Sequence, residues 1–364
     1  MGTPATLQSA RKELGQLFMM GFDGLELADE TSAFIAQAGI GGVILFALNY
    51  ESPGQVAELI NQVQECRADM PLWISVDHEG GKVQRFKKGF TKIPDAATIT
   101  ASASPRLAFE IAEMMGKELK AVGINLNYSP VADINTNPKN PVIGVRSYGP
   151  DEETVSKMSS AFVRGQLIAG VQACVKHFPG HGDTSQDSHF ALAKVSTPLK
   201  TLREREFRPF VKAFKGRCNF VMTAHIVNPT IDAKYPATLS PTFLREILRK
   251  EIRYTKIILS DDMEMKAITD HFGAEDAPRL AIEAGCDILI YRSEAAARHA
   301  YASLLKDLES GKLKPDYVCE AADRIRGIKR ECLIPYQAIV VGDLSQKIGT
   351  AENLALVARA TPTA

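Results

Sequence analysis

Short hydrophobic segments recur along the whole chain, and stretches with helical periodicity separate them. Eight such segments, each bounded by glycine or polar residues, occupy residues 16–22, 41–46, 72–77, 124–131, 172–178, 219–225, 256–261 and 287–292. Their hydrophobic residues are continuous rather than alternating, a pattern typical of parallel strands that are buried on both faces. The segments therefore predict eight parallel β-strands.

The stretches between these segments carry the pattern of amphipathic helices. Residues 53–70 and 104–123 place apolar side chains at helical spacing, and a serine or aspartate often precedes such stretches as a candidate N-cap. Strand–helix units repeated eight times predict an α/β fold, the (β/α)8 TIM barrel. A doubly wound open sheet is the alternative, but no G-x-G-x-x-G motif follows the first strand.

No linker, internal repeat or low-complexity tract divides the chain. Its 364 residues fall within the range of one TIM barrel with its loops, so we expect residues 1–364 to form a single catalytic domain. From about residue 295 onward, the segments 295–308 and 351–360 indicate closing helices. We expect these helices to pack outside the barrel.

Composition narrows the possible partners and the location. Lysine and arginine together number 43, as do aspartate and glutamate, so the net charge is zero and argues against a nucleic-acid partner. No apolar run is long enough to span a bilayer, and the first residues lack a signal-peptide pattern, which predicts a cytoplasmic protein without a membrane partner. The six isolated cysteines are expected to be reduced thiols. The oligomeric state is left open.

Polar and charged residues follow five of the predicted strands directly. In a TIM barrel the active site gathers at the carboxyl ends of the strands. Any one of these residues could be a helix cap or a solvated strand end, and for a single aspartate that is the better explanation. Recurrence on five strands nevertheless predicts a site. These residues are Asp77, His78, Glu79, Lys82 and Arg85 after the third strand, Asp133 after the fourth, Lys176 and His177 on the fifth, Thr223 and His225 on the sixth, and Ser260, Asp261 and Asp262 on the seventh.

The segment 176–189, KHFPGHGDTSQDSH, concentrates histidine and aspartate in fourteen residues. Metal binding is one interpretation, since His177, His181, Asp183, Asp187 and His189 are of ligand type. A proline and two glycines, however, break any helix that would present the histidines on one face, as helical zinc motifs require. We therefore expect neither a metal nor a cofactor.

Proton transfer is the second interpretation of this segment. Asp187 and His189 are two residues apart, so the carboxylate can bind one ring nitrogen and leave the other free to move a proton. A surface loop with a local histidine hydrogen bond is the plainer alternative. Asp261, aimed at the barrel mouth, is a candidate nucleophile that could attack a sugar's anomeric carbon with His189 as acid and base, which predicts retention of configuration. No G-x-S-x-G motif supports serine catalysis.

Four motifs together resemble glycoside hydrolase family 3, and most closely its single-domain β-N-acetylglucosaminidases. They are DHEGGKVQRF at 77–86, NPKNPVIGVRSYG at 137–149, KHFPGHGDTSQDSH at 176–189 and SDDMEM at 260–265. The resemblance runs from about residue 15 to about residue 350. It implies a TIM barrel and a retaining mechanism, in agreement with the strand count.

The resemblance also implies a role for individual residues. Asp261 falls on the family's nucleophile, His189 on its unusual histidine acid/base, and Asp187 on the partner of that histidine. Met222 and Met265 would offer apolar surface to the sugar ring. The substrate-binding residues implied are Asp77, Arg85, Arg146, Lys176 and His177. The chain departs from the family at His78 and Lys82, where glutamine and arginine are common, and we expect these two to alter the rim of the sugar pocket.

The implied activity is hydrolysis of terminal β-linked N-acetylglucosamine from cell-wall muropeptides, as in peptidoglycan recycling, or from chitooligosaccharides. Two alternatives lie within the same family, a phosphorylase of N-acetylglucosaminides and a β-glucosidase. Outside this enzyme class, the alternatives are an inactive barrel that only binds sugar and a metal-dependent hydrolase. The predicted partner is a small carbohydrate.

Overall fold

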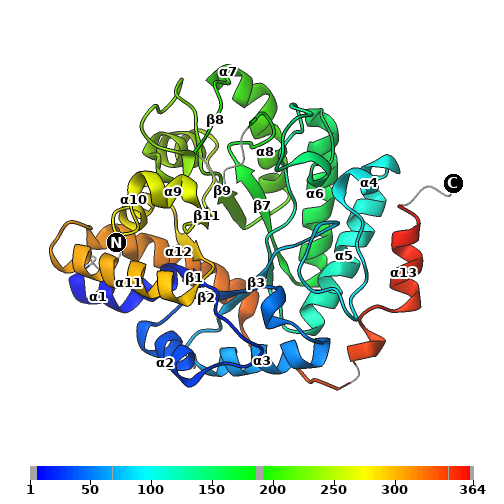
Figure 1. Cartoon of the computed structure of the whole chain (residues 1–364), viewed down its shortest axis with the longest axis horizontal. Helices are drawn as coiled ribbons and strands as arrows, with labels where there is room; N and C mark the ends of the chain where they lie inside the picture. The colour runs from blue at the N-terminus through cyan, green and yellow to red at the C-terminus, as the bar shows by residue number, and fades with distance from the viewer. Residues whose placement is uncertain (1–5, 68, 186–191, 343, 361–364) are drawn as a thin grey trace.

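The computed structural model describes residues 6–67, 69–185, 192–342 and 344–360. A closed barrel of parallel strands forms its centre (Figure 1), in the order β1-β12-β11-β9-β7-β6-β3-β2. The first and last strands close it, with Phe18 opposite Leu289 and Met20 opposite Tyr291. The barrel strands are β1 (Phe18–Met20), β2 (Gly42–Leu45), β3 (Trp73–Val76), β6 (Leu126–Asn127), β7 (Gln172–Phe178), β9 (Phe220–Thr223), β11 (Ile257–Asp262) and β12 (Ile288–Tyr291).

Seven of the eight predicted segments contain one barrel strand each, and β11 extends one residue beyond the remaining one, 256–261, so the predicted TIM barrel is confirmed and the doubly wound alternative is wrong. The continuous hydrophobic pattern has a simple physical reason. The strands are covered on one face by helices and filled on the other by each other's side chains, so β2, β3, β9 and β12 are buried at every position. Trp73 and Phe220 meet edge to face in this core, with ring centroids 4.9 Å apart.

Helices surround the barrel (Figure 1). The predicted N-caps are present, since Ser52, Ser104 and Asp151 each accept a hydrogen bond from the backbone two or three residues into their helix. The α-helices are α1 (Leu7–Glu13), α2 (Asp29–Ala38), α3 (Pro53–Glu65), α4 (Ala96–Ala101), α5 (Pro105–Ala121), α6 (Glu152–Ala169), α7 (Leu199–Thr201), α8 (Phe207–Lys215), α9 (Lys266–Phe272), α10 (Ala277–Ala284), α11 (Glu294–Glu309), α12 (Pro315–Leu333) and α13 (Ala351–Ala358).

Shorter or wider helical turns complete the framework. The 3₁₀ turns are η1 (Leu14–Leu17), η2 (Ala47–Asn49), η3 (Gly144–Arg146), η5 (Ala237–Leu239) and η7 (Leu344–Gln346). The π-helical segments are η4 (Leu202–Glu206) and η6 (Thr242–Glu251).

Two small sheets lie outside the barrel and organise its loops. β4 (His78–Gly80) and β5 (Val83–Gln84) form an antiparallel pair directly after β3. β8 (Ala193–Lys194) pairs in parallel with β10 (Ile226–Val227). The turn after β4 requires glycine, because Gly80 has a φ of 102° and a Cβ there would lie 2.4 Å from the carbonyl oxygen of Pro94.

The C-terminal helices α11, α12 and α13 lie outside the barrel strands, and α13 runs beside α5 (Figure 1). Glu118 of α5 fastens the last described residues to a loop near the barrel mouth. Its carboxylate accepts hydrogen bonds from Thr91 Oγ1 at 2.6 Å, from the Gly349 backbone at 2.8 Å and from Asn353 Nδ2 at 2.7 Å. That residues 1–364 form one catalytic domain stays a prediction.

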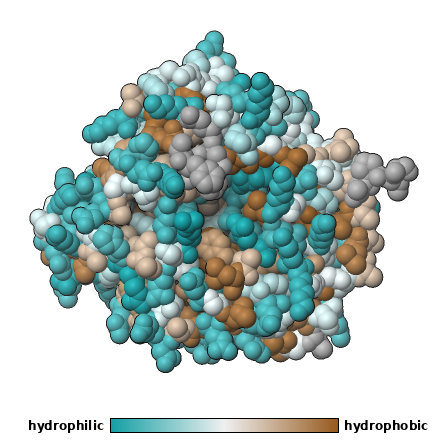
Figure 2. All heavy atoms as spheres, viewed as in Figure 1, coloured by the Kyte–Doolittle hydropathy of each residue, from teal (hydrophilic) through white to brown (hydrophobic). Residues whose placement is uncertain are grey.

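The surface seen in Figure 2 is mostly hydrophilic, with hydrophobic side chains scattered among polar ones. All six cysteines are free thiols, as predicted, and Cys174, Cys218 and Cys286 are buried. Among the described residues, no helix combines the length and the hydrophobicity needed to cross a bilayer.

Candidate active site

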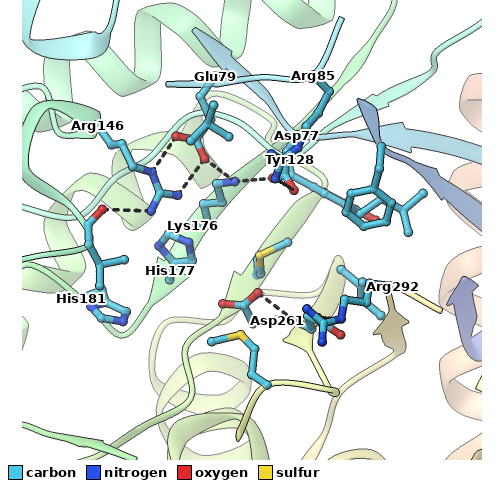
Figure 3. A pocket seen from close by; sticks show the side chains of 18 residues that line it. Asp77, Glu79, Arg85, Tyr128, Arg146, Lys176, His177, His181, Asp261 and Arg292 are labelled. Carbon is cyan, nitrogen blue, oxygen red and sulfur yellow. Dashed lines mark hydrogen bonds and ion pairs between the residues drawn. The ribbon is translucent and has the colours of Figure 1, made fainter. Parts of the chain in front are cut away.

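A cavity of about 300 Å³ opens at the carboxyl ends of the barrel strands (Figure 3). Its volume is at the lower end of the range for small-molecule sites. The polar residues that line it are Asp77, Glu79, Arg85, Arg146, Lys176, His177, His181, Asp261, Asp262 and Arg292. The remaining wall consists of Ile44, Phe46, Val83, Tyr128, Val142, Met222, Met265 and Ile290.

Six of the eight predicted site residues line this one cavity, although they come from two strands (β7 and β11), the turn η3 and the residues directly after β3 and β5. They are Asp77, Arg85, Arg146, Lys176, His177 and Asp261. The other two, Asp187 and His189, lie outside the described residues. Met222 and Met265 also line the cavity, where the resemblance placed them.

Lys176, at the end of β7, lies between two carboxylates. Its Nζ donates to Asp77 Oδ1 at 2.7 Å and lies 2.6 Å from Glu79 Oε1. Arg146 binds Glu79 with two prongs, Nε to Oε2 at 2.9 Å and Nη2 to Oε1 at 2.8 Å. Three strand ends and the turn η3 are thereby joined into one network of charge-assisted hydrogen bonds.

Burial and neighbouring charges oppose each other in this network, and the charges prevail. Burial alone would raise the pKa of Glu79, but Arg146 and Lys176 hold it well below its ordinary value. Burial alone would lower the pKa of Lys176, but Asp77 and Glu79 raise it. Both groups therefore stay ionised, so this wall of the cavity offers fixed donors and acceptors.

Arg85 completes the wall above Asp77. Its Nη2 lies 3.6 Å from Asp77 Oδ2, and its guanidinium stands 5.9 Å from the ring centroid of Phe46, within cation–π range. The Nε of Arg85 is buried without a hydrogen-bond partner among the described residues. A bound molecule with an acceptor oxygen would satisfy this donor.

Asp133 is completely buried behind two histidines. It accepts hydrogen bonds from the backbone of His181 at 2.7 Å and of His177 at 3.2 Å, and its Oδ2 lies 2.6 Å from Nδ1 of His177. Burial would raise the pKa of Asp133, but the charge and hydrogen bond of His177 lower it. An ionised Asp133 makes Nδ1 of His177 a donor and orients the ring toward the cavity.

His181 is neutral, because burial lowers its pKa to about 4. Its Nδ1 lies 2.9 Å from the hydroxyl of Thr184. The peptide bond between Lys176 and His177 is cis. Both side chains of this pair line the cavity.

Asp261 lies near the end of β11, on the side of the cavity opposite Glu79 and Arg146 (Figure 3). Its Oδ1 accepts a hydrogen bond from the backbone N–H of Asp262 at 2.8 Å. The carboxyl group of Asp262 has its pKa raised to about 7, mainly by burial and further by the charges of Glu264 and Asp261. Asp261 therefore faces the ion-pair network of Glu79, Arg146 and Lys176 across the cavity, a position suited to a nucleophile.

Sequence reasoning counted Glu79, Asp133 and Asp262 among the strand-end residues but gave none of them a role. It considered His181 only as a metal ligand and did not consider Arg292. Four of these line the cavity and Asp133 holds its histidines. Their position in the sequence could have identified them, because each lies at the end of a predicted strand or within a few residues after it. Arg292 directly follows β12 and is the last residue of the eighth predicted segment, 287–292.

The two departures from the family pattern do not line the cavity itself, and the expectation that they alter its rim stays a prediction. His78 is buried, with its ring 6.0 Å from that of Phe86 and 5.7 Å from that of Phe90. Lys82 lines a separate small recess next to Asp95.

Other chemistries find less support in the geometry. Within 6–67, 69–185, 192–342 and 344–360, no group of three or more histidine, cysteine, aspartate or glutamate side chains is placed to hold a metal ion. Ser260 is buried in the barrel, where its hydroxyl accepts a hydrogen bond from the backbone of Ile290. It is therefore not placed as a nucleophile.

Comparisons with known proteins agree with this geometry. Residues 9–328 match the family model of the glycosyl hydrolase family 3 N terminal domain. The beta-hexosaminidase of Methylococcus capsulatus is 36% identical over 302 residues, which cover 82% of this chain and 88% of that protein. Beta-hexosaminidase A of Pseudoalteromonas piscicida is 33% identical over 330 residues, but the match covers 83% of this chain and only 55% of that protein.

Among solved structures, the chain is similar to a glycoside hydrolase family 3 β-N-acetylglucosaminidase from Paenibacillus sp. str. FPU-7. The TM-score is 0.92 at 39% sequence identity, and the match covers 96% of this chain and 68% of that one. The chain therefore spans about half the length of the Pseudoalteromonas protein and about two thirds of the Paenibacillus protein. It spans most of the Methylococcus protein.

Proposed function

The chain belongs to glycosyl hydrolase family 3, and we propose that it is a retaining β-N-acetylglucosaminidase. One observation carries the proposal: Asp261 faces a wall of ionised hydrogen-bonding groups across a cavity of about 300 Å³. The relatives named above are two beta-hexosaminidases and a β-N-acetylglucosaminidase, which supports an N-acetylated aminosugar as the substrate.

The polar side chains of the cavity would bind the hydroxyl groups and the N-acetyl group of the sugar. Asp77 accepts from hydroxyls through its carboxylate oxygens, and Lys176 orients the carboxylate through its hydrogen bond to Oδ1. Arg85 and His177 donate from either side, Arg85 through the Nε that lacks a partner. Met222 and Met265 contribute apolar surface next to Asp261. The sugar is then fixed by polar contacts on one side and apolar contacts on the other.

The reaction would proceed in two displacement steps. In the first, a carboxylate oxygen of Asp261 forms a bond to the anomeric carbon while the glycosidic bond breaks and His189 gives its proton to the leaving oxygen. In the second, His189 takes a proton from water, whose oxygen attacks the anomeric carbon and displaces Asp261. Two inversions restore the original configuration.

A histidine suits both proton transfers. Its reference pKa of about 6.5 lets it act as an acid and as a base near neutrality, without the burial that a glutamate would need. It also adds no further negative charge near Asp261, where Asp262 already has its pKa raised to about 7. Asp187 would orient the ring of His189, in the role that the family resemblance gives it.

The natural substrate is proposed as a muropeptide fragment or a chitooligosaccharide with a terminal N-acetylglucosamine. The cytoplasmic location remains a prediction from the sequence. Hydrolysis by the family's β-glucosidase activity or phosphorolysis by phosphate are the alternatives that the test below distinguishes.

The test incubates the protein with p-nitrophenyl N-acetyl-β-D-glucosaminide and, in parallel, with the β-D-glucoside, each with and without phosphate and chelator. We expect N-acetylglucosamine released first as the β-anomer, no effect of chelator, and loss of activity in Asp261→Ala. Asp276→Ala, which removes an exposed carboxylate beside α10, is the matched control. A sugar 1-phosphate, an α-anomer, or turnover of the glucoside alone would contradict the proposal, as would no turnover at all.

A further inference from the structure

Glu118 is a buried acidic residue of α5 that connects two distant parts of the chain. Its Oε1 accepts hydrogen bonds from Thr91 Oγ1 at 2.6 Å, from the Gly349 backbone at 2.8 Å and from Asn353 Nδ2 at 2.7 Å. Its Oε2 accepts one from the Thr91 backbone at 3.1 Å. Both carboxylate oxygens are in use, so one side chain joins the loop after β5 to the C-terminal residues 344–360.

Thr91 lies in the loop after β5 and is bonded to the residues around Arg85. The Nε2 of Gln84 donates to the carbonyl oxygen of Thr91 at 2.9 Å and to that of Phe86 at 3.0 Å. Gln84 and Phe86 are the two sequence neighbours of Arg85. The backbone on either side of Arg85 is therefore connected to Thr91 through a single glutamine side chain.

Packing holds the same loop against its surroundings. Phe86 stacks on Tyr50, with ring centroids 4.6 Å apart, and its ring centroid lies 5.5 Å from that of Phe90. The C-terminal residues approach the loop closely, since a Cβ at Gly349 would lie 2.3 Å from the carbonyl oxygen of Gly89. The loop and the C-terminal residues therefore pack backbone against backbone, which only glycine permits at this distance.

The guanidinium of Arg85 has weaker contacts of its own. The side chain is 35% exposed, and its Nη2 lies 3.6 Å from Asp77 Oδ2, which is longer than an ordinary hydrogen bond. The place of the guanidinium in the cavity therefore depends on the position of its backbone. That position is set by the contacts of Thr91 with Gln84 and with Glu118.

Glu118 does not line the cavity, so it has no direct part in binding the sugar. We propose that Glu118 is a positioning residue, which holds the loop after β5 against the C-terminal residues and thereby sets the place of Arg85 for substrate binding. The inference rests on the proposed sugar-binding role of Arg85. Its physical basis is pre-organisation, because a donor that is already in place loses less conformational freedom when the substrate binds.

Glu118→Gln tests the inference with little change of shape. If the amide oxygen keeps the three hydrogen bonds of Oε1, the amide nitrogen faces the backbone N–H of Thr91, a donor against a donor. We expect KM for p-nitrophenyl N-acetyl-β-D-glucosaminide to rise about fivefold and kcat to change by less than about twofold, because substrate binding is weakened while the reacting groups stay in place.

The same substitution in an Arg85→Ala protein separates a positioning role from a general structural one. We expect Arg85→Ala alone to raise KM about tenfold, and Glu118→Gln to raise it further by less than about 1.5-fold, because its effect acts through the missing side chain. A general structural role would give the same rise in both proteins. Glu113→Gln, which removes an ion pair with Lys117 on the same helix, is the control and should resemble the unmodified protein.

Thr91→Val and Thr91→Ser test the same contact from the loop and serve if Glu118→Gln does not fold. Valine removes the hydroxyl that donates to Glu118 Oε1, whereas serine keeps a hydroxyl. We expect Thr91→Val to raise KM as Glu118→Gln does. Thr91→Ser should keep KM within about twofold of the unmodified protein, because the hydrogen bond is retained.

If Arg85→Ala leaves KM unchanged, the proposed role of Arg85 fails, and the inference fails with it. If Arg85→Ala raises KM but Glu118→Gln raises it equally with and without Arg85, or in neither case, only the inference is overturned. The Arg85 variant therefore distinguishes the two failures. Equal KM values for Thr91→Val and Thr91→Ser would also overturn the inference.

Discussion

Glu79 and Arg146 form a two-pronged ion pair in which the side chains are only 7% and 17% exposed. The Glu79 carboxylate also receives Lys176, so one anion satisfies two buried cations. Its removal would leave both cations without this partner in a poorly solvated place. Glu79 therefore stabilises the folded cavity wall, because its negative charge compensates the two buried cations.

We expect Glu79→Gln to lower the free energy of unfolding by about 3 kcal/mol, because breaking a buried ion pair leaves an uncompensated charge. Urea unfolding at neutral pH measures this change. Glu153→Gln, which removes an exposed ion pair with Lys157, is the control and should change stability by less than about 1 kcal/mol. Equal effects of the two substitutions would contradict the prediction.

The stabilisation by Glu79 should also depend on pH in one direction. Its pKa is lowered in the folded protein, so its contribution is fully present above the unfolded value of about 4.3 and is lost as the pH falls through the folded value. Between pH 6 and pH 3, the difference in stability between the unmodified protein and Glu79→Gln should therefore be constant at first and begin to shrink below about pH 4.3. A difference that stays constant over this whole interval would speak against it.

Asp133→Asn is expected to lower kcat/KM at least tenfold. An amide nitrogen in place of Oδ2 would face Nδ1 of His177 and change which ring nitrogen carries the proton. Kinetics with the p-nitrophenyl glycoside measure the loss. Asp151→Asn is a suitable comparison, because asparagine still caps α6 and the position is remote from the cavity. Full activity of Asp133→Asn would show that the tautomer of His177 is irrelevant.

Glu206→Gln should make the protein less sensitive to rising pH. Burial raises the pKa of Glu206 to about 7, so its favourable contribution is present below the unfolded value of about 4.3 and disappears as the pH rises through 7. The unmodified protein should lose stability relative to the variant between pH 5 and pH 8. Thermal unfolding across this range measures the difference, and a constant difference would refute the expected titration.

Lys329→Met tests a buried amine whose effect on stability should increase with pH, in contrast to that of Glu206. Lys329 is completely buried, donates to Gly41 O at 2.7 Å and has its pKa lowered well below its ordinary value by burial. Its contribution is present above the unfolded value of about 10.4 and is lost as the pH falls toward the folded value. Stability of the unmodified protein should therefore rise between pH 7 and pH 10, while the methionine variant stays flatter.

The barrel was predictable because its signal is local. Each strand is a short hydrophobic run that must be buried on both faces, and the caps Ser52 and Asp151 mark helix starts in the sequence itself. Five site residues were predictable for a related reason, since a parallel barrel brings all strand ends to one mouth. The sixth, Arg146, was implied only by the family resemblance.

The rest depends on contacts between distant segments, which no local pattern contains. Glu79 was one charged residue among several after β3, and only the meeting with Arg146, far along the chain, shows that it belongs to the wall. The same is true of Asp133, whose partner His177 comes from another strand. His78 illustrates the reverse error, because a polar residue next to Asp77 points into an aromatic cluster instead of the cavity.

The barrel can close only near the end of protein synthesis, because its first strand pairs with its last. The ribosome makes β1 early and its partner β12 late, and the Glu118 hydrogen bonds to Gly349 and Asn353 form later still. A nascent chain that ends before β12 has an open sheet with unpaired strand edges on both sides. These edges can pair with other chains until the last strand emerges.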